Sequence, residues 1–159
     1  MGVVTHTNEL TCSISPSRMF KAMFLDAHNL MPKLMPHTIK SIEKLEGDGG
    51  AGTVVQINFS AGPFKYIKHR TDEVDVENHF CKYTLIEGDV LGDNLECITH
   101  EVKLDTTCNG GCVCKTTSHF HCKDDAVLNA EEMKAGIEKA EEIHKTIETY
   151  LTENSEVYA

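Results

Sequence analysis

The chain of 159 residues has no apolar run approaching the roughly 18 residues that indicate a membrane-spanning helix. Its N-terminus, MGVVTHTNEL, lacks the basic start and apolar segment of a secretory signal, and His6 stands where the myristoylation pattern requires Ser or Thr. Basic residues are few, since 15 Lys and Arg against 25 Asp and Glu give a formal net charge of −10. This charge argues against phosphate-based nucleic-acid binding. We therefore expect neither nucleic acid nor a membrane as a partner.

The seven cysteines also lack a disulfide or zinc framework. Their odd number and the missing signal favour reduced thiols and a cytoplasmic location. The segment CNGGCVCKTTSHFHC contains no C-x2-C pair, and strand alternation separates Cys112 and Cys114 from His119 and His121. Cys97 opposite His121 stays open as an adventitious metal pair. We expect no physiological metal and no cofactor.

The segment EGDGGAGT, residues 46–53, invites comparison with phosphate-binding loops. It has no Lys, which a Walker loop requires, and the following TVVQINFS reads as a strand instead of the helix of a Rossmann motif. The carboxylates of Glu46 and Asp48 would also repel an anion. We therefore predict a β-hairpin whose glycines supply positive φ angles: Gly47, Gly49, Gly50 and Gly52.

Periodicity predicts an α+β domain spanning residues 1–159. An opening strand over 3–14 is followed by a helix capped by Ser15 with Pro16 at its first position. A second short helical piece, HNLMPKLMP over 28–36, is bounded by Pro32 and Pro36. Six further strands are predicted over 38–47, 53–60, 64–75, 79–89, 96–106 and 112–122. Their short Gly- and Asp-rich breaks favour an antiparallel meander.

A long C-terminal helix is expected to begin at Asn129, with Glu132 completing a capping-box-like pattern. Its apolar stripe comprises Met133, Ile137, Ala140, Ile143, Ile147 and Leu151.

Alternation along the strands collects one mostly apolar face that carries a few polar groups. Its members are Ile57, Phe59, Phe64, Tyr66, Cys81, Tyr83, Leu85, Ile98, His100, Val102, Cys114, Thr116, Ser118 and Phe120. A mostly apolar wall with a few polar groups is typical of a ligand pocket, although a core with satisfied hydroxyls has the same pattern. No G-x-S-x-G elbow surrounds any serine, so catalysis would require that a cavity enclose a histidine such as His69, His100 or His119.

Three segments resemble the plant pathogenesis-related class 10 proteins, the family of the birch-pollen major allergen: EGDGGAGT, KYTLIEGD and EEMKAGIEKAEEIHKTIETYL. The resemblance runs nearly end to end, and CKYTLIEGDVL is also similar to the phenolic-coupling-associated member from St John's wort. It implies a seven-stranded antiparallel sheet curved around the C-terminal helix, two short helices in a V, and a large internal cavity. The cavity would bind amphipathic metabolites such as flavonoids, cytokinins, other hormones, fatty acids or steroids.

Carrying the family's pocket over by motif names its expected walls. They are Met23, Met31, Ile39, Phe59, Tyr66, Tyr83, His100, Val102 and Ser118, with Met133, Gly136, Ala140 and Ile143 from the helix. We expect a binding, storage or transport protein linked to defence, monomeric with a dimer as the alternative. An enzyme using the same cavity for condensation or isomerisation, with His100 or Tyr83 as proton donor, is the second hypothesis.

Ribonuclease activity, described for some family members, is the third hypothesis. Glu96, Glu148 and Tyr150 stand at matching places, but the usual lysine is replaced by Val55. No catalytic residue is therefore assigned. Other relatives of the family are enzymes of alkaloid biosynthesis, and one of them, norcoclaurine synthase, uses a pocket lysine. No equivalent lysine is expected here, because Lys68 and Lys82 are expected to face outward by parity.

Overall fold

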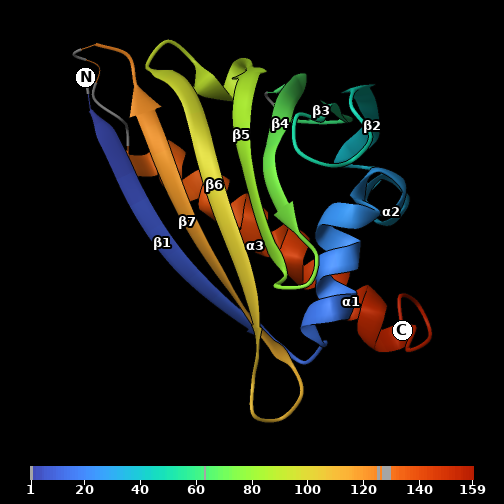
Figure 1. The fold of residues 1–159 in the computed structure, drawn as a ribbon. Coiled ribbons are helices and arrows are strands. Elements are labelled where there is room, and N and C mark those ends of the chain that lie inside the picture. Colours follow the sequence, from blue (N-terminus) through green and yellow to red (C-terminus); the bar gives the residue numbers. More distant parts are fainter. Residues whose placement is uncertain (1, 63, 125, 127–129) are drawn as a thin grey trace.

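The computed structural model describes residues 2–62, 64–124, 126 and 130–159, with Glu132 described by its backbone alone. Seven antiparallel strands form one sheet in the order β1-β7-β6-β5-β4-β3-β2, which leaves β1 and β2 at the edges (Figure 1). The strands are β1 (Val3–Cys12), β2 (Ile39–Glu46), β3 (Val54–Phe59), β4 (Tyr66–Asp75), β5 (Phe80–Gly88), β6 (Leu95–Thr106) and β7 (Cys112–Cys122). The predicted strands are therefore confirmed.

The helices are α1 (Pro16–Phe20), a π-helical turn η1 (Lys21–Leu25), α2 (Ala27–Leu34), a 3-10 turn η2 (Asp89–Leu91) and α3 (Ala130–Glu153). Ser15 caps α1 as predicted, because its side chain accepts a hydrogen bond from the Arg18 N–H. The short helical piece predicted over 28–36 is α2, and Pro32 lies inside this helix instead of bounding it. The proposed cap at Asn129 and the side chain of Glu132 lie outside the described residues.

Helix α3 runs along one face of the sheet, and its C-terminal end reaches α1 and α2 (Figure 1). The Arg18 guanidinium fixes this end, because it donates to the carbonyl oxygens of Leu151 at 3.0 Å, Asn154 at 2.8 Å and Val157 at 2.9 Å. Carbonyls at a helix C-terminus have no partner within the helix, so a cation there is stabilising.

Buried apolar side chains on the helix side of the sheet form two clusters. The first joins the short helices to the C-terminal half of α3 and one end of the sheet: Ile14, Met19, Phe20, Ala22, Leu30, Cys81, Val102, Leu104, Cys112, Cys114, Ile147 and Leu151. The second lies at the other end of the sheet, around η2: Leu85, Leu91, Leu95, Ile98, Phe120 and Cys122. The strip of sheet between them is the region of interest for function.

The glycine segment is the hairpin between β2 and β3, as predicted. Gly47, Gly49 and Gly52 have φ angles of +89°, +106° and +90°. Two of the loop's amides are satisfied within the protein, since Gly49 N–H donates to Thr53 Oγ1 and Gly52 N–H to the Thr71 carbonyl, both at 2.8 Å. These donors are therefore not available to a phosphate.

Candidate functional site

A polar row crosses the inner face of the sheet between the two apolar clusters. Antiparallel register places Tyr83 of β5 opposite His100 of β6, His100 opposite Ser118 of β7, and Ser118 opposite His6 of β1. Side chains opposite one another across a ladder point to the same face. His100 Nδ1 lies 2.8 Å from Ser118 Oγ, so two of the four groups are hydrogen-bonded to each other.

Aromatic rings extend this row toward the short helices. The Tyr83 centroid lies 5.0 Å from His100, 4.9 Å from His69 and 6.1 Å from Phe24, and Phe24 lies 5.2 Å from Phe20. These separations are those of attractive tilted ring pairs. The rings thus form a continuous path from α1 to the middle of the sheet.

Both imidazoles in this path are uncharged near neutral pH. Burial lowers the pKa of His69 to about 3, with a smaller contribution from His100. Burial likewise lowers the pKa of His100 to about 4, and it raises the pKa of the Tyr83 phenol well above its ordinary value. His69, Tyr83 and His100 nevertheless keep partly accessible surface. They are neutral hydrogen-bonding groups withdrawn from bulk water.

The predicted orientation of Tyr66 was wrong. Its hydroxyl donates to Glu87 Oε2 at 2.6 Å, and Lys68 Nζ lies 3.2 Å from the same oxygen. The side chains of Lys68 and Glu87 are 26% and 50% exposed and lie on the outer face. Ile67, between Tyr66 and Lys68, packs against the inner cluster around η2. Tyr66 therefore lies on the side of the sheet opposite Tyr83, and Lys68 faces outward as expected.

His69 takes the inner position that was assigned to Tyr66. The β4–β5 register is irregular between Lys68 and His69, where β5 carries the extra residue, and between Thr71 and Glu73. Tyr66 to His69 therefore keep simple alternation, and the error was the face assigned to it. Strict alternation from Tyr66 would place His69 outside, and His69 was considered only as a candidate catalytic histidine. The signal that could have found it was the parity of Ile67, an apolar residue two positions before it.

The other predicted strand and short-helix residues lie on the inner side. Met23 and Met31 are partly buried against the first cluster, and Val102 belongs to it. Ile39 is buried and lies opposite half-buried Phe59 at the edge of the sheet. The structure thus places the polar row and these residues on the inner face of the sheet, whereas Tyr66 lies on the outer face.

Helix α3 offers a less continuous wall than predicted. Met133 packs against the second cluster and Ile143 against the first. Between them Gly136 and Ala140 are exposed, and no atom lies within 4 Å of the place where a Cβ would stand on Gly136. At these two positions, therefore, the helix is not packed on the sheet, whereas Ile137 between them is half-buried.

The sequence analysis did not predict a role for His144, which also lies on α3. His144 is only 4% exposed, and its Nε2 atom has no hydrogen-bond partner in the part of the chain that the structure describes. Burial lowers its pKa, and Glu148 one turn later opposes that effect. A buried polar atom without a hydrogen-bond partner lowers the stability of the fold, and the apolar stripe of this helix did not predict one.

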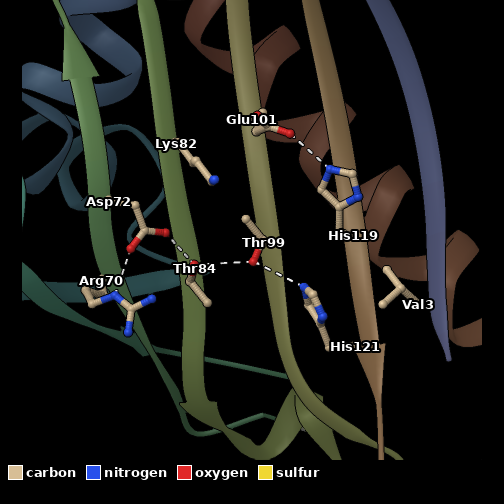
Figure 2. Close-up of a pocket in the computed structure, with 9 residues that line it drawn as sticks. All are labelled: Val3, Arg70, Asp72, Lys82, Thr84, Thr99, Glu101, His119 and His121. Carbon is tan, nitrogen blue, oxygen red and sulfur yellow. Dashed lines mark hydrogen bonds and ion pairs between the residues drawn. The ribbon is translucent and has the colours of Figure 1, made fainter. Parts of the chain in front are cut away.

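The outer face carries a different surface, shown in Figure 2. A hollow of about 490 Å³ is lined by Val3, Arg70, Asp72, Lys82, Thr84, Thr99, Glu101, His119 and His121. Its polar groups are largely joined to each other: Arg70 to Asp72 at 2.8 Å, and His119 to Glu101 at 2.9 Å. A surface with one apolar residue and paired charges does not suit an amphipathic ligand.

The outer face also contains the pair considered for a metal. Cys97 lies opposite His121 as predicted, but His121 Nε2 contacts Thr99 Oγ1 at 3.5 Å. Within the described ranges no group of three or more His, Cys, Asp or Glu residues is placed to hold a metal ion. Two candidate ligands alone do not make a structural zinc site, which takes four.

Sequence comparison decides the family. Residues 1–154 match the model of the pathogenesis-related protein Bet v 1 family. The chain belongs to this family. Similar Bet v 1 family members include the major allergen Pru av 1 of Prunus avium, 50% identical over 99% of both chains, and the pathogenesis-related protein STH-2 of Solanum tuberosum, 48% identical over 100% of both. Its relatives thus tie the chain to allergens and defence-linked proteins.

Solved structures agree on the Bet v 1 fold. The crystal structure of Ara h 8.0201 covers 96% of this chain and 99% of its own with a TM-score of 0.87 at 35% identity. Norcoclaurine synthase from Thalictrum flavum, crystallised with dopamine and hydroxybenzaldehyde, gives a TM-score of 0.74 at 22% identity, covering 96% of this chain and 88% of its own. The second likeness shows a shared fold alone. Among the described residues no helix is long and apolar enough to cross a membrane.

Proposed function

We propose that this Bet v 1 family member binds a small amphipathic plant metabolite, such as a flavonoid or cytokinin, between the inner face of the sheet and α3. The observation that carries the proposal is the polar row of Tyr83, His100 and Ser118 lying between two separate apolar clusters. A single dry core would have continued across this strip. Apolar walls with a few oriented polar groups are what a small-molecule site requires.

The polar groups define which ligand chemistry fits. Low pKa values keep His69 and His100 neutral, and the high pKa of Tyr83 keeps its phenol protonated. Such groups exchange hydrogen bonds with hydroxyls, carbonyls and ring nitrogens, and they offer no charge to balance a carboxylate or phosphate. An uncharged flat ligand with hydrogen-bonding groups at its edge is favoured.

Apolar contact would supply most of the affinity. Burial of flat ligand surface contributes roughly 25 cal/mol per Å² before the costs of association. Met23 and Met31 beside the first cluster give the walls adaptable side chains, which suits several related ligands. We further propose that the protein stores or transports such metabolites in the cytoplasm as a monomer.

Displacement of a fluorescent apolar probe tests the proposal. Wild-type protein is titrated with a panel of flavonoids and cytokinins, and melting temperature is recorded with each compound. His100→Ala and Tyr83→Phe are expected to weaken binding about twofold to tenfold, since each removes a hydrogen bond worth roughly 0.5–1.5 kcal/mol. His121→Ala, on the outer face, is the matched control and should bind as wild type does.

Two results would reject the proposal. Either no compound displaces the probe or raises the melting temperature, or the His121 variant loses as much affinity as the His100 variant. The second result would place the ligand on the outer face.

Catalysis in the same space is the alternative, tested by turnover of candidate precursors. Hydrogen-bonding groups without an ionised base fit binding better than acid–base chemistry.

For a nuclease, Glu96 and Glu148 are badly placed. Glu96 adjoins the end of β7 where Leu95 pairs with Cys122. Glu148 accepts a hydrogen bond from the Ser13 N–H, beside the opposite end of β7, where Cys12 pairs with Cys112. The two ends of β7 are about 30 Å apart at ~3.3 Å per strand residue.

A further inference from the structure

Three cysteines gather where β1 ends and β7 begins, away from the polar row. Cys12 and Cys112 are direct cross-strand partners, and their sulfur atoms lie 3.2 Å apart. Cys108 lies in the turn between β6 and β7 and is exposed. Cys12 and Cys108 line one surface recess together with Glu148. All are free thiols, as are the remaining four cysteines.

We propose that Cys12 and Cys112 form a redox-active dithiol that a hydroperoxide converts into a disulfide joining β1 to β7.

Geometry favours this pair. Directly opposed residues of an antiparallel ladder have Cβ atoms about 4.5–5.5 Å apart, close to the separation that a disulfide needs. The observed 3.2 Å between sulfurs leaves about 1.2 Å to close to a bond of ~2.05 Å. The two backbone segments lie close together here, because a side chain on Gly111 would collide with the Cys12 carbonyl oxygen. Modest side-chain rotation therefore suffices.

The two sulfurs are not equivalent, and this assigns their roles. Cys12 is half-buried and opens into the recess, whereas Cys112 is fully buried behind it. A hydrogen bond from Cys112 lowers the pKa of Cys12 to about 7, although burial and the Glu148 carboxylate oppose the shift. The thiolate is the reactive form of cysteine, so Cys12 attacks and Cys112 resolves.

The chemistry proceeds in two steps. The Cys12 thiolate attacks one peroxide oxygen, so that the S–O bond of a sulfenic acid forms, the O–O bond breaks, and the leaving oxygen takes a proton from solvent. The Cys112 sulfur then attacks the Cys12 sulfur, the S–S bond forms, and the hydroxyl leaves as water with the Cys112 proton. Two electrons pass from the thiols to the peroxide.

Other thiols are poorer candidates for this reaction. Burial raises the pKa of Cys81 to about 12 and that of Cys114 to about 11, so neither supplies much thiolate at neutral pH. Cys108 is accessible, but it is not the strand partner of Cys12. It is therefore the competitor that the experiment must distinguish.

Peptide mapping of the full-length protein provides the test. Reduced protein is treated with hydrogen peroxide, free thiols are alkylated, and trypsin is added. Cys12 then lies in the peptide 1–18, while Cys108, Cys112 and Cys114 share the peptide 104–115. We expect these peptides joined, about 2 Da lighter than their sum because two hydrogens are lost, with fragmentation assigning the bond to Cys112.

Variants separate the thiols. Cys108→Ser should keep the cross-link, whereas Cys112→Ser should abolish it and leave Cys12 as a sulfenic acid that dimedone labels. Fragmentation of the wild-type cross-link remains decisive even if the Cys112 variant folds poorly. A bond from Cys12 to Cys108 or Cys114, or oxidation that leaves Cys12 and Cys112 unlinked, would overturn the proposal.

Discussion

The His69 ring lies 4.9 Å from the Tyr83 ring, with neither group ionised at neutral pH. This contact joins β4 to β5 at the centre of the inner face. It makes the stability of the fold depend on the protonation of a buried imidazole, and the same holds for His100 on the other side of Tyr83.

Acid should destabilise the protein through these two histidines. Their folded pKa values, about 3 and about 4, lie below the ordinary value of 6.5, so the unfolded chain binds protons first as pH falls. Stability is full above pH 6.5 and decreases toward the folded pKa values. At pH 5 each histidine should cost up to about 2 kcal/mol of unfolding free energy.

Urea denaturation between pH 7.5 and 4.5 measures this loss. His69→Phe should reduce the pH dependence of the unfolding free energy by about half. The control His37→Gln, at an exposed position, should show the same pH dependence as the wild type. Equal slopes in the wild type and the His69 variant would show that His69 does not contribute.

Replacement of His144 should stabilise the protein without ligand. Its buried Nε2 has no partner in the described part of the chain, so His144→Leu removes an unsatisfied group and should raise the unfolding free energy by about 1–2 kcal/mol. Chemical denaturation at pH 7.5 is the measurement, with exposed Lys145→Leu as the control. A loss of stability in the His144 variant would mean that the imidazole has a partner after all.

Removal of the Arg18 side chain should release the C-terminal end. Arg18→Leu deletes hydrogen bonds to three carbonyls and should cost about 2–4 kcal/mol. Lys139→Leu, at an exposed ion pair on α3, should change stability by less than about 1 kcal/mol. Comparable losses in the two variants would contradict the role given to Arg18.

Strand and helix positions followed from periodicity and capping alone. The Ser15 cap and all seven strands were predictable because each depends on neighbours in the sequence. The inner face was predictable on β5, β6 and β7, where the ladder is regular through Tyr83, His100 and Ser118. The resemblance supplied the curvature of the sheet around the C-terminal helix and the placement of the short helices, which periodicity does not determine. The pairing of β1 with β7 came from neither source.

The errors arose where local rules are broken. On β4 the alternation was assigned to the wrong face, because it was counted from Tyr66 and not from the apolar Ile67, so Tyr66 was placed inside and His69 was not. Pro32 is accommodated inside α2, although proline usually ends a helix. The Nε2 atom of His144 lies on the buried stripe with no hydrogen-bond partner among the described residues, against the expectation that buried polar atoms are satisfied.

The glycine hairpin offers a final prediction with an internal control. A Cβ on Gly47 would lie 2.5 Å from Thr53 Oγ1, and its φ of +89° is unfavourable for any side chain, so Gly47→Ala should cost about 1–3 kcal/mol. Gly49→Val should also destabilise, because φ is +106° even though space is open there. Gly50 has no positive φ and only one contact, Asp48 Oδ1 at 3.5 Å, so Gly50→Ala should be nearly neutral. Thermal melting of the three variants orders them, and a Gly50 variant as unstable as the Gly47 variant would contradict the role given to positive φ and close contact in this loop.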